Sequence, residues 1–403
     1  MRVLFLTHRL PYAPNRGDRL RAYHMLRAMR AEADVDLVSL VHDRDEASHA
    51  PDLRELASSV TTLPLSWPHR AARSIHALAG SQPLTHALLD APGAARTLSA
   101  LVASRPPDVV LAFCSSMARF GLEPPLAGRP LVVDLVDVDS SKWRALAATT
   151  RWPLSAVYRR EARCLASFEA LVTRSAAATL VVNDRERQAL RAIVPDAEPV
   201  VLQNGVDVEH FRPPTAPSSR EAVVFTGVMN YAPNAQAAIW LAEDVWPLVR
   251  QRRPGACLDI VGASPTGDVR RLAHRYSDVT VTGSVPGVRE YLWNAAVAVA
   301  PLRVARGVQN KVVEAVAAGL PCLVTPAVFE GVPEEVRPAC LVRDDARSFA
   351  EAILALLERS PTERRALASR GDVSAIDWPS RMHPLLPLLR EASLRHAAQS
   401  GTR

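Results

Sequence analysis

Short apolar runs alternate along this chain with longer segments in which apolar residues recur every three or four positions. Runs of three to seven apolar residues are typical of buried strands, and the periodic segments are typical of helices with one buried face. Strands are predicted at 3–6, 35–41, 109–113, 131–136, 179–182, 200–202, 223–225, 258–261, 279–281, 297–300, 320–325 and 340–342. This alternation predicts an α/β fold of parallel sheets with helices on both faces.

The helices and the domain boundaries follow from the same pattern. Helices are predicted at about 18–30, 161–176, 234–252, 346–358, 361–370 and 379–396, and the stretch 52–102 is predicted to be mostly helical. At 403 residues the chain is too long for one ordinary hydrophobic core. We expect a Rossmann-like domain at 1–206, a proline-rich linker at 207–220, a second Rossmann-like domain at 221–376, and a C-terminal helix at 377–403 that crosses back to the first domain.

The stretch 306–319, RGVQNKVVEAVAAG, carries the densest polar chemistry between two predicted strands. Its loop and first helical turn contain Arg306, Gly307, Gln309, Asn310 and Lys311. Glu314 lies three positions after Lys311, so the two share a helix face. Free amides at a helix N-terminus, with a guanidinium and an ammonium, are suited to a phosphate. A carboxylate one turn further is suited to sugar hydroxyls, so the stretch predicts a nucleotide-sugar pocket.

Lysine usage supports this interpretation. The chain contains two lysines, Lys142 and Lys311, and its other basic side chains are arginines and histidines. In a chain so biased toward arginine, a retained lysine suggests a site that needs a compact ammonium and not a planar fork. Chance retention is the alternative, but both lysines fall within polar motifs.

Two features of the first half are candidates for chemistry. Gly17 follows the first predicted strand, where a glycine lets the backbone approach a ligand, although a glycine in such a turn is by itself a weak signal. Asp134, Asp137 and Asp139 crowd the strand at 131–136 and its exit. Regular alternation would place Val133, Leu135 and Asp137 on one face. Either Asp139 or Ser140 caps the next helix, or a carboxylate projects toward a substrate as a general base.

Composition restricts the partners and the compartment. The net charge of +6 and the pI near 9.3 favour an anionic partner, which could be a phosphorylated substrate, an anionic membrane surface or nucleic acid. Nucleic acid ranks last, because the sequence does not interleave aromatic and basic residues. No apolar run of about 18 residues is long enough to span a bilayer. A peripheral membrane contact is expected at the helix around 16–30, which carries Arg16, Arg19, Arg21, Arg27 and Arg30, unless these form an ordinary solvated face.

Five cysteines, at 114, 164, 257, 322 and 340, lie far apart and lack metal-ligand spacing. Free thiols of this kind fit a reducing cytosol. The apolar run at the N-terminus is too short for a signal peptide. A cytoplasmic protein is therefore expected, with peripheral contact at the inner face of the plasma membrane.

Three motifs resemble the GT-B glycosyltransferases of family 4, whose two Rossmann-like domains face each other across a cleft. They are QNGVDVEHFRP at 203–213, VFTGVMNYAPN at 224–234 and NKVVEAVAAGLPCLVT at 310–325. The motifs NRGDRLRAYH, VDVDSSKW and RGVQNKVVEAVAAG resemble the exopolysaccharide-associated (PEP-CTERM/EpsH type) sugar transferases. The resemblance covers essentially the whole chain. It implies a retaining hexosyltransferase that uses a nucleotide-diphosphate sugar and a lipid-linked or polysaccharide acceptor. No metal is expected, because the second domain has two fixed cations but no paired-Asp motif placed to bridge a metal and a diphosphate.

The resemblance also implies roles for single residues. Glu314 would bind the ribose hydroxyls, and Gly17 and Gly227 would lie beside the donor. The chain departs from the family where a glutamate is usual eight positions before Glu314, because Arg306 stands there. It departs again after Gly227, where Met229, Asn230 and Tyr231 replace the usual basic residues. We infer that the diphosphate contacts have moved to Arg306 and Lys311.

Asp137, with Asp139 second, is the candidate for action at the acceptor hydroxyl. Two alternatives stay open. The chain could be a sugar-nucleotide epimerase that uses the same pocket. It could also be a non-catalytic nucleotide-sugar-binding partner of a polysaccharide synthase complex, because Arg306 stands where the family usually has a glutamate. An NAD-type dehydrogenase is excluded, because neither domain start carries a GxGxxG turn.

Overall fold

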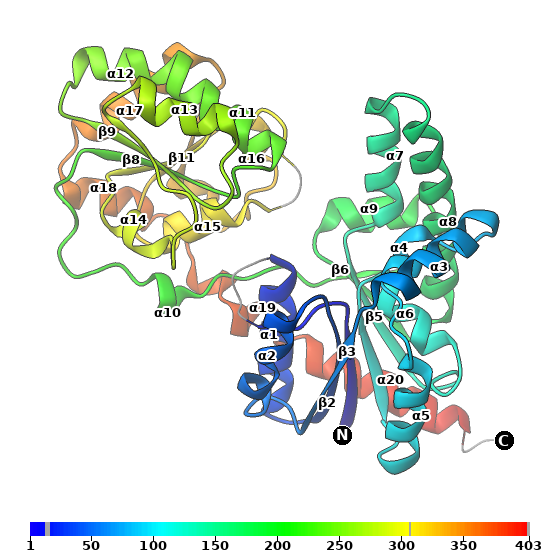
Figure 1. The fold of residues 1–403 in the computed structure, drawn as a ribbon. Helices are drawn as coiled ribbons and strands as arrows, with labels where there is room; N and C mark the ends of the chain where they lie inside the picture. Colours follow the sequence, from blue (N-terminus) through cyan, green and yellow to red (C-terminus); the bar gives the residue numbers. More distant parts are fainter. Residues whose placement is uncertain (13–16, 306–307, 401–403) are drawn as a thin grey trace. The chain divides into compact units, whose positions relative to one another are not determined.

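The computed structural model describes residues 1–12, 17–305 and 308–400 (Figure 1). The chain divides into two compact units, one formed by Met1–Gln203 with Arg381–Arg403 and the other by Asn204–Ser380. Each unit contains a sheet of parallel strands interleaved with helices. The predicted α/β class, with two Rossmann-like doubly wound units, is therefore confirmed.

In the first unit the described strands form the order β3-β2-β1-β4-β5-β6-β7. The strands are β1 (Arg2–Thr7), β2 (Asp34–Val41), β3 (Ser59–Pro64), β4 (Val109–Phe113), β5 (Leu131–Val136), β6 (Ala178–Val181) and β7 (Val200–Val201). The helices are α1 (Gly17–Arg30), α2 (Arg44–Ser48), α3 (Trp67–Ala79), α4 (Leu84–Leu88), α5 (Ala94–Ser104), α6 (Ser115–Leu122), α7 (Asp139–Thr149), α8 (Leu154–Ser175), α9 (Asp184–Arg191) and α20 (Leu385–Ser400). The order reverses between β1 and β4, so this edge is the topological switch point.

The stretch 52–102 is mostly helical, as predicted, but it also contains the strand β3, which was not predicted. β3 pairs in parallel with β2 at the edge of the sheet. Its sequence is SVTTLP, in which the first four residues are half-buried, Leu63 is buried and Pro64 is exposed. An edge strand of this kind needs no continuous apolar run, and the hydrophobic pattern therefore did not reveal it.

In the second unit the described strands form the order β10-β9-β8-β11-β12-β13, with the switch point between β8 and β11. The strands are β8 (Ala222–Thr226), β9 (Cys257–Val261), β10 (Val279–Val281), β11 (Val297–Ala300), β12 (Cys322–Val324) and β13 (Cys340–Val342). The helices are α10 (Val208–Phe211), α11 (Ala232–Trp240), α12 (Trp246–Arg252), α13 (Gly267–Arg275), α14 (Arg289–Trp293), α15 (Asn310–Ala317), α16 (Pro326–Phe329), α17 (Ala346–Leu357), α18 (Pro361–Ala368) and α19 (Trp378–Met382). A π-helical turn at Leu241–Val245 joins α11 to α12 within the predicted helix at 234–252.

The predicted C-terminal helix at 379–396 is interrupted. α19 ends at Met382, α20 begins at Leu385, and Pro384 between them cannot continue a helix. α20 packs against α1, β4 and β5 of the first unit. None of the described helices combines the length and the apolar character that a bilayer crossing requires.

The chain enters and leaves the second unit through one short parallel bridge. Val206 pairs with Asp377, and its amide donates to the carbonyl of Ile376 over 2.9 Å. A Cβ at Gly205 would lie 2.7 Å from the Cα of Trp378, so only glycine fits at that position. The first residues of the stretch predicted as a linker are thus held against the second unit, where Phe211 joins the apolar core.

Candidate functional site

The switch point of the second unit is built around two glycines that touch. Gly227 follows β8 and Gly262 follows β9. A Cβ on Gly262, whose φ is +147°, would lie 1.8 Å from the carbonyl oxygen of Gly227. A Cβ on Gly227 would lie 2.8 Å from Nδ2 of Asn234. The backbone after β8 can therefore pass beside the start of α11 only because both positions lack side chains.

Asn234 joins this glycine turn to the predicted donor helix α15. Its Nδ2 donates to the carbonyl of Val228 over 3.0 Å, and its Oδ1 accepts from Nζ of Lys311 over 2.7 Å. The Lys311 ammonium also lies 5.3 Å from the centre of the Phe225 ring. Sequence analysis did not assign a role to Asn234, although it ends the VFTGVMNYAPN motif.

Lys311 and Glu314 are both shifted from their ordinary ionisation by burial. Burial lowers the pKa of Lys311 to about 8, against the opposing attraction of Glu314. Burial raises the pKa of Glu314 to about 7, against the opposing attraction of Lys311. Within the described part of the chain, no hydrogen bond is donated to the Glu314 carboxyl group. Ionisable groups whose burial disfavours their charged forms, and that lie beside a glycine turn, are typical of a ligand site.

The other predicted donor residues have the following positions. Gln309 occupies the N-cap position of α15 without capping it by its side chain, and Asn310 begins the helix. Gly17 begins α1 in the first unit. Arg306 and Gly307 lie outside the described residues. The structure thus brings together Gly227, Asn234, Lys311 and the helix that carries Glu314.

In the first unit, Asp134 is a structural residue. Its Oδ2 accepts from Nε of Arg21 over 2.7 Å, and both side chains are buried. Its Oδ1 accepts the amide of Val136 over 3.0 Å. Val136 has a φ of 63°, and the pairing of β5 with β6 shifts register between Asp134 and Val136. The predicted regular alternation from Val133 to Asp137 is therefore wrong at the strand end, because the Asp134 side chain turns the backbone there.

Asp137 and Asp139 follow this irregular strand end. Asp137 is exposed, and Asp139 is the first residue of α7. Neither Asp139 nor Ser140 caps α7, whose N-cap position is Val138, so the predicted capping role is wrong. Oδ2 of Asp139 accepts from Oγ of Ser115 over 3.3 Å. Ser140 instead bonds Glu169, to which its hydroxyl and amide donate.

The carboxyl groups of Asp137 and Asp139 share one electrostatic setting. Desolvation raises the pKa of each, and the Lys142 ammonium lowers it. Solvent screens the shift at Asp137, which is exposed. Lys142, the second lysine of the chain, therefore acts on this carboxylate pair.

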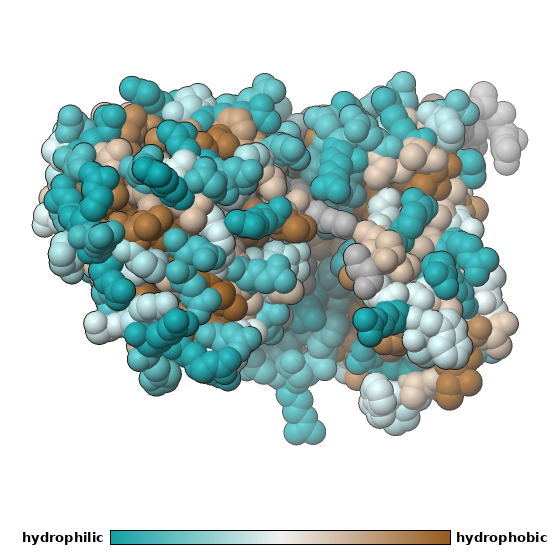
Figure 2. Space-filling view, turned by 90° about the horizontal axis from the view of Figure 1, so that it is seen from above, coloured by the Kyte–Doolittle hydropathy of each residue, from teal (hydrophilic) through white to brown (hydrophobic). Residues whose placement is uncertain are grey.

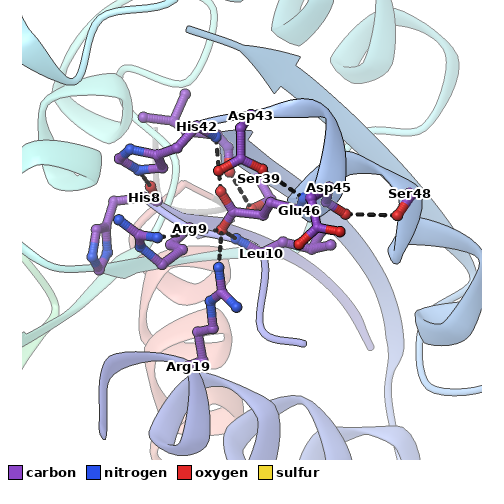
Figure 3. A network of polar contacts seen from close by, with 11 residues as sticks. His8, Arg9, Leu10, Arg19, Ser39, His42, Asp43, Asp45, Glu46 and Ser48 are labelled. Atoms are coloured by element: carbon purple, nitrogen blue, oxygen red, sulfur yellow. Dashed lines mark hydrogen bonds and ion pairs between the residues drawn. The ribbon is translucent and has the colours of Figure 1, made fainter. Parts of the chain in front are cut away.

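A buried glutamate that sequence analysis missed contacts residues that follow β1 and β2 and a residue of α1. Figure 3 shows Glu46 of α2 at the centre of a polar network. Its carboxylate accepts the amides of Leu10 over 3.1 Å and of His42 over 2.8 Å. It also accepts from Nη2 of Arg19 over 3.3 Å. Glu46 thereby links Leu10, which follows β1, to Arg19 on α1, and no local sequence signal marks it.

Similar solved structures have the same fold. The chain matches sucrose-phosphate synthase from Thermosynechococcus elongatus at 17% identity with a TM-score of 0.69, covering 97% of this chain and 98% of that one. It matches Anabaena HepE in complex with UDP at 16% identity with a TM-score of 0.66, over 97% and 100% of the two chains. An α,α-trehalose-phosphate synthase (UDP-forming) from Burkholderia vietnamiensis matches at 14% identity with a TM-score of 0.67, over 97% and 100%. No curated protein matches the chain.

Two parallel doubly wound units that match these structures define the GT-B fold. Family models identify the chain further. Residues 17–205 match the glycosyl transferase 4-like domain, and residues 220–359 match the glycosyl transferases group 1. The two matches together span most of the chain, which therefore belongs to these glycosyltransferases and is a transferase.

Proposed function

We propose that this glycosyltransferase transfers a sugar from a nucleotide-diphosphate sugar to a lipid-linked or polysaccharide acceptor, with retention, in exopolysaccharide biosynthesis. The observation that carries the donor assignment is the Lys311–Asn234 contact beside the Gly227 turn, with Glu314 one helical turn away. This group of residues lies at the carboxyl ends of β8 and β11, where open parallel sheets bind ligands. Support comes from HepE, whose solved structure contains UDP.

Each donor residue then has a chemical task. Lys311, with Arg306 and the amides of Gln309 and Asn310, would hold the diphosphate at the start of α15. Glu314 would accept hydrogen bonds from the ribose hydroxyls. Three glycines, Gly17, Gly227 and Gly307, would let the backbone approach the donor.

The reaction needs charge stabilisation on the leaving group. As the bond from the anomeric carbon to the diphosphate breaks, negative charge grows on the phosphate, and the Lys311 ammonium lies ready to stabilise it. In the retaining reaction the acceptor oxygen forms its bond on the same face, and its proton passes to the leaving phosphate. Asp137, with Asp139 second, would position the acceptor hydroxyl or stabilise the reacting centre.

Protein cations would replace a divalent metal in this proposal. Among the described residues, no three His, Cys, Asp or Glu side chains are grouped as metal ligands would be. Turnover should therefore persist after EDTA treatment. A complete loss that Mg²⁺ or Mn²⁺ restores would contradict this part of the proposal.

The decisive experiment begins with the donor. A thermal-shift panel of UDP, GDP, ADP and CMP should identify the base, because a ligand that binds the folded state raises the melting temperature. Sugars linked to that nucleotide are then tested for transfer to a native lipid extract. Transfer of the sugar supports the proposal. Quantitative conversion of the donor to its epimer without acceptor, or donor binding without turnover, would overturn it.

The acceptor class suggests where the enzyme works. A lipid-linked acceptor lies at a bilayer, so we place the enzyme in the cytoplasm, in peripheral contact with the anionic inner face of the plasma membrane. The basic composition of the chain supports this placement.

A further inference from the structure

Two segments of the first unit contain no acidic residue. The chain has 42 acidic residues among 403, yet neither 65–89 nor 140–160 contains one. The first segment contains Arg70 and Arg73, and the second contains Lys142, Arg144, Arg151, Arg159 and Arg160. Each segment therefore carries only positive formal charge.

The fold joins these two segments. The Arg160 guanidinium donates to carbonyls at the end of α3 and just beyond it, those of Ala77, Gly80 and Gln82. The neighbouring Glu161 accepts the amides that begin α4, from Leu84 over 2.7 Å and Thr85 over 2.8 Å. α7 packs along α8. The end of α3 and the start of α4 therefore lie beside α8, which α7 accompanies as the other arm of the α7–α8 hairpin (Figure 1).

Large apolar side chains project from these same helices into solvent. On α3 the exposed fractions are 72% for Trp67, 70% for Ile75 and 51% for Leu78. On the α7–α8 hairpin, 80% of Trp152, 54% of Leu154 and 40% of Leu146 are exposed. We call these six residues the tryptophan face.

Ion-pair contacts on the side opposite its exposed apolar residues set the orientation of α3. At 100° per residue, Trp67, Ile75 and Leu78 fall within about 80° of one another around the helix axis. His69 and Arg73 lie on the opposite side, where both contact Asp90, over 3.1 Å and 2.9 Å. α3 is thus held by its polar side and turns its apolar side outward, the reverse of an ordinary surface helix.

Exposed apolar residues alone do not mark an interface in this protein. Figure 2 shows hydrophobic patches scattered among hydrophilic side chains on the face seen from above. The tryptophan face differs because its apolar groups include two tryptophans and because two exposed arginines, Arg151 and Arg159, lie in the same acid-free segment as Trp152. Tryptophan favours the interface between water and a bilayer, and arginine favours anionic headgroups.

We propose that the tryptophan face docks on an anionic lipid bilayer. This assignment rests on the peripheral membrane contact proposed above and gives it a location. It also replaces the contact expected from α1. Arg21 is buried against Asp134, and Arg19 pairs with Glu46. Arg16 lies outside the described residues, which leaves Arg27 and Arg30 exposed on α1.

Flotation of the full-length protein with vesicles tests the proposal. Vesicles that contain phosphatidylglycerol should bind the protein, vesicles of phosphatidylcholine alone should bind it at least tenfold less, and rising salt should release it. The double variant Trp67→Gln, Trp152→Gln should lower binding at least tenfold. Ile75→Ser should weaken binding, whereas Leu394→Ser on α20, with the same exposed fraction of 70%, should not.

A second pair of variants separates the two basic surfaces. Arg151→Gln with Arg159→Gln should reduce binding and flatten its salt dependence, while Arg27→Gln with Arg30→Gln on α1 should leave both unchanged. All four arginines are exposed. Three outcomes would overturn the proposal. They are an effect confined to the Arg27 and Arg30 pair on α1, equal binding to both vesicle types, and full binding by the tryptophan variant.

Two controls keep the outcomes distinct. UDP-induced thermal shifts of each variant report whether the fold and the donor site persist. Size-exclusion chromatography without lipid shows whether the wild type self-associates and whether the tryptophan variant abolishes that self-association. If it does, the tryptophan face binds a second copy of the chain and the membrane proposal is wrong. Vesicle binding that persists without any sugar transfer would contradict the proposed function and leave the docking surface standing.

Discussion

Nζ of Lys311 lies 2.7 Å from Oδ1 of Asn234, and this hydrogen bond connects two helices that begin at the same switch point. Asn234 is buried, and its amide nitrogen is committed to the carbonyl of Val228. Its oxygen is therefore held in one position, where it accepts from the Lys311 ammonium. The contact orients Lys311 before any ligand binds, and it reaches across 77 positions of sequence.

Removal of the ammonium should weaken donor binding. Lys311→Ala should lower the affinity for UDP, or for whichever nucleoside diphosphate binds, at least tenfold, because a charge-assisted hydrogen bond contributes roughly 1.5–3 kcal/mol. Isothermal titration calorimetry measures this change, with Arg347→Ala on α17 as an exposed basic control. Unchanged affinity in the Lys311 variant would remove the assignment of this residue to the diphosphate.

The same ammonium should make diphosphate binding depend on pH. The pKa of Lys311 is lowered to about 8, so the free protein loses this positive charge as the pH rises through that value. The phosphate keeps its full charge there, since its last ionisation lies near pH 6. Affinity should fall between pH 7 and pH 9 in the wild type. A Lys311→Ala variant should show a shallower fall, to which the Glu314 carboxyl group still contributes, and an identical slope in both proteins would contradict the prediction.

Glu314→Gln should stabilise the protein while it impairs donor binding. The folded-state pKa of about 7 exceeds the ordinary value of 4.5, so the ionised carboxylate is disfavoured in the folded state. The wild-type free energy of unfolding should therefore fall as the pH rises from 4.5 to 7 and stay low above that. At pH 8 the variant should be more stable by up to about 3 kcal/mol.

Urea denaturation at pH 5 and pH 8 measures this effect, with Glu351→Gln on α17 as the exposed control. At pH 5 the two proteins should differ far less. A variant that is less stable than the wild type at pH 8, or that binds nucleotide diphosphate with full affinity, would refute the role given to Glu314.

Asparagine substitutions test the carboxylates of the first unit. Asp137→Asn keeps the shape of an exposed side chain and should lower turnover without a change in melting temperature; loss of a general base costs about 10²–10⁴ in rate. Asp139→Asn should give a smaller loss of turnover, and its side-chain oxygen can still accept from Ser115. If both variants turn over at the wild-type rate, the pair is structural.

Gly205→Ala should destabilise the second unit. The added Cβ would lie 2.7 Å from the backbone nitrogen of Trp378, and backbone atoms on both sides are held by the bridge from Val206. We expect a loss of at least about 1–3 kcal/mol, as for other overpacked sites. Gly255→Ala is the matched control, because a Cβ there meets nothing within 4 Å. Equal melting temperatures for the two variants would contradict the predicted clash.

The sequence alone determined the elements whose burial is continuous. β4, β5 and β11 have the predicted bounds, because buried apolar residues make up nearly all of each strand. The helix that carries Lys311 and Glu314 was predicted for a similar reason: their spacing is a property of one local segment, and helical geometry fixes it.

Tertiary structure alone decided which polar residues serve the fold and which are left for chemistry. Asp134 and Asp137 are indistinguishable in sequence. In the structure, Asp134 forms a buried ion pair with Arg21, which is 113 positions away, whereas Asp137 is exposed. Glu46 and Asn234 were missed because their partners come from other elements. A hydrogen bond is set by the distance between two groups in space, and a local pattern records only the distance along the chain.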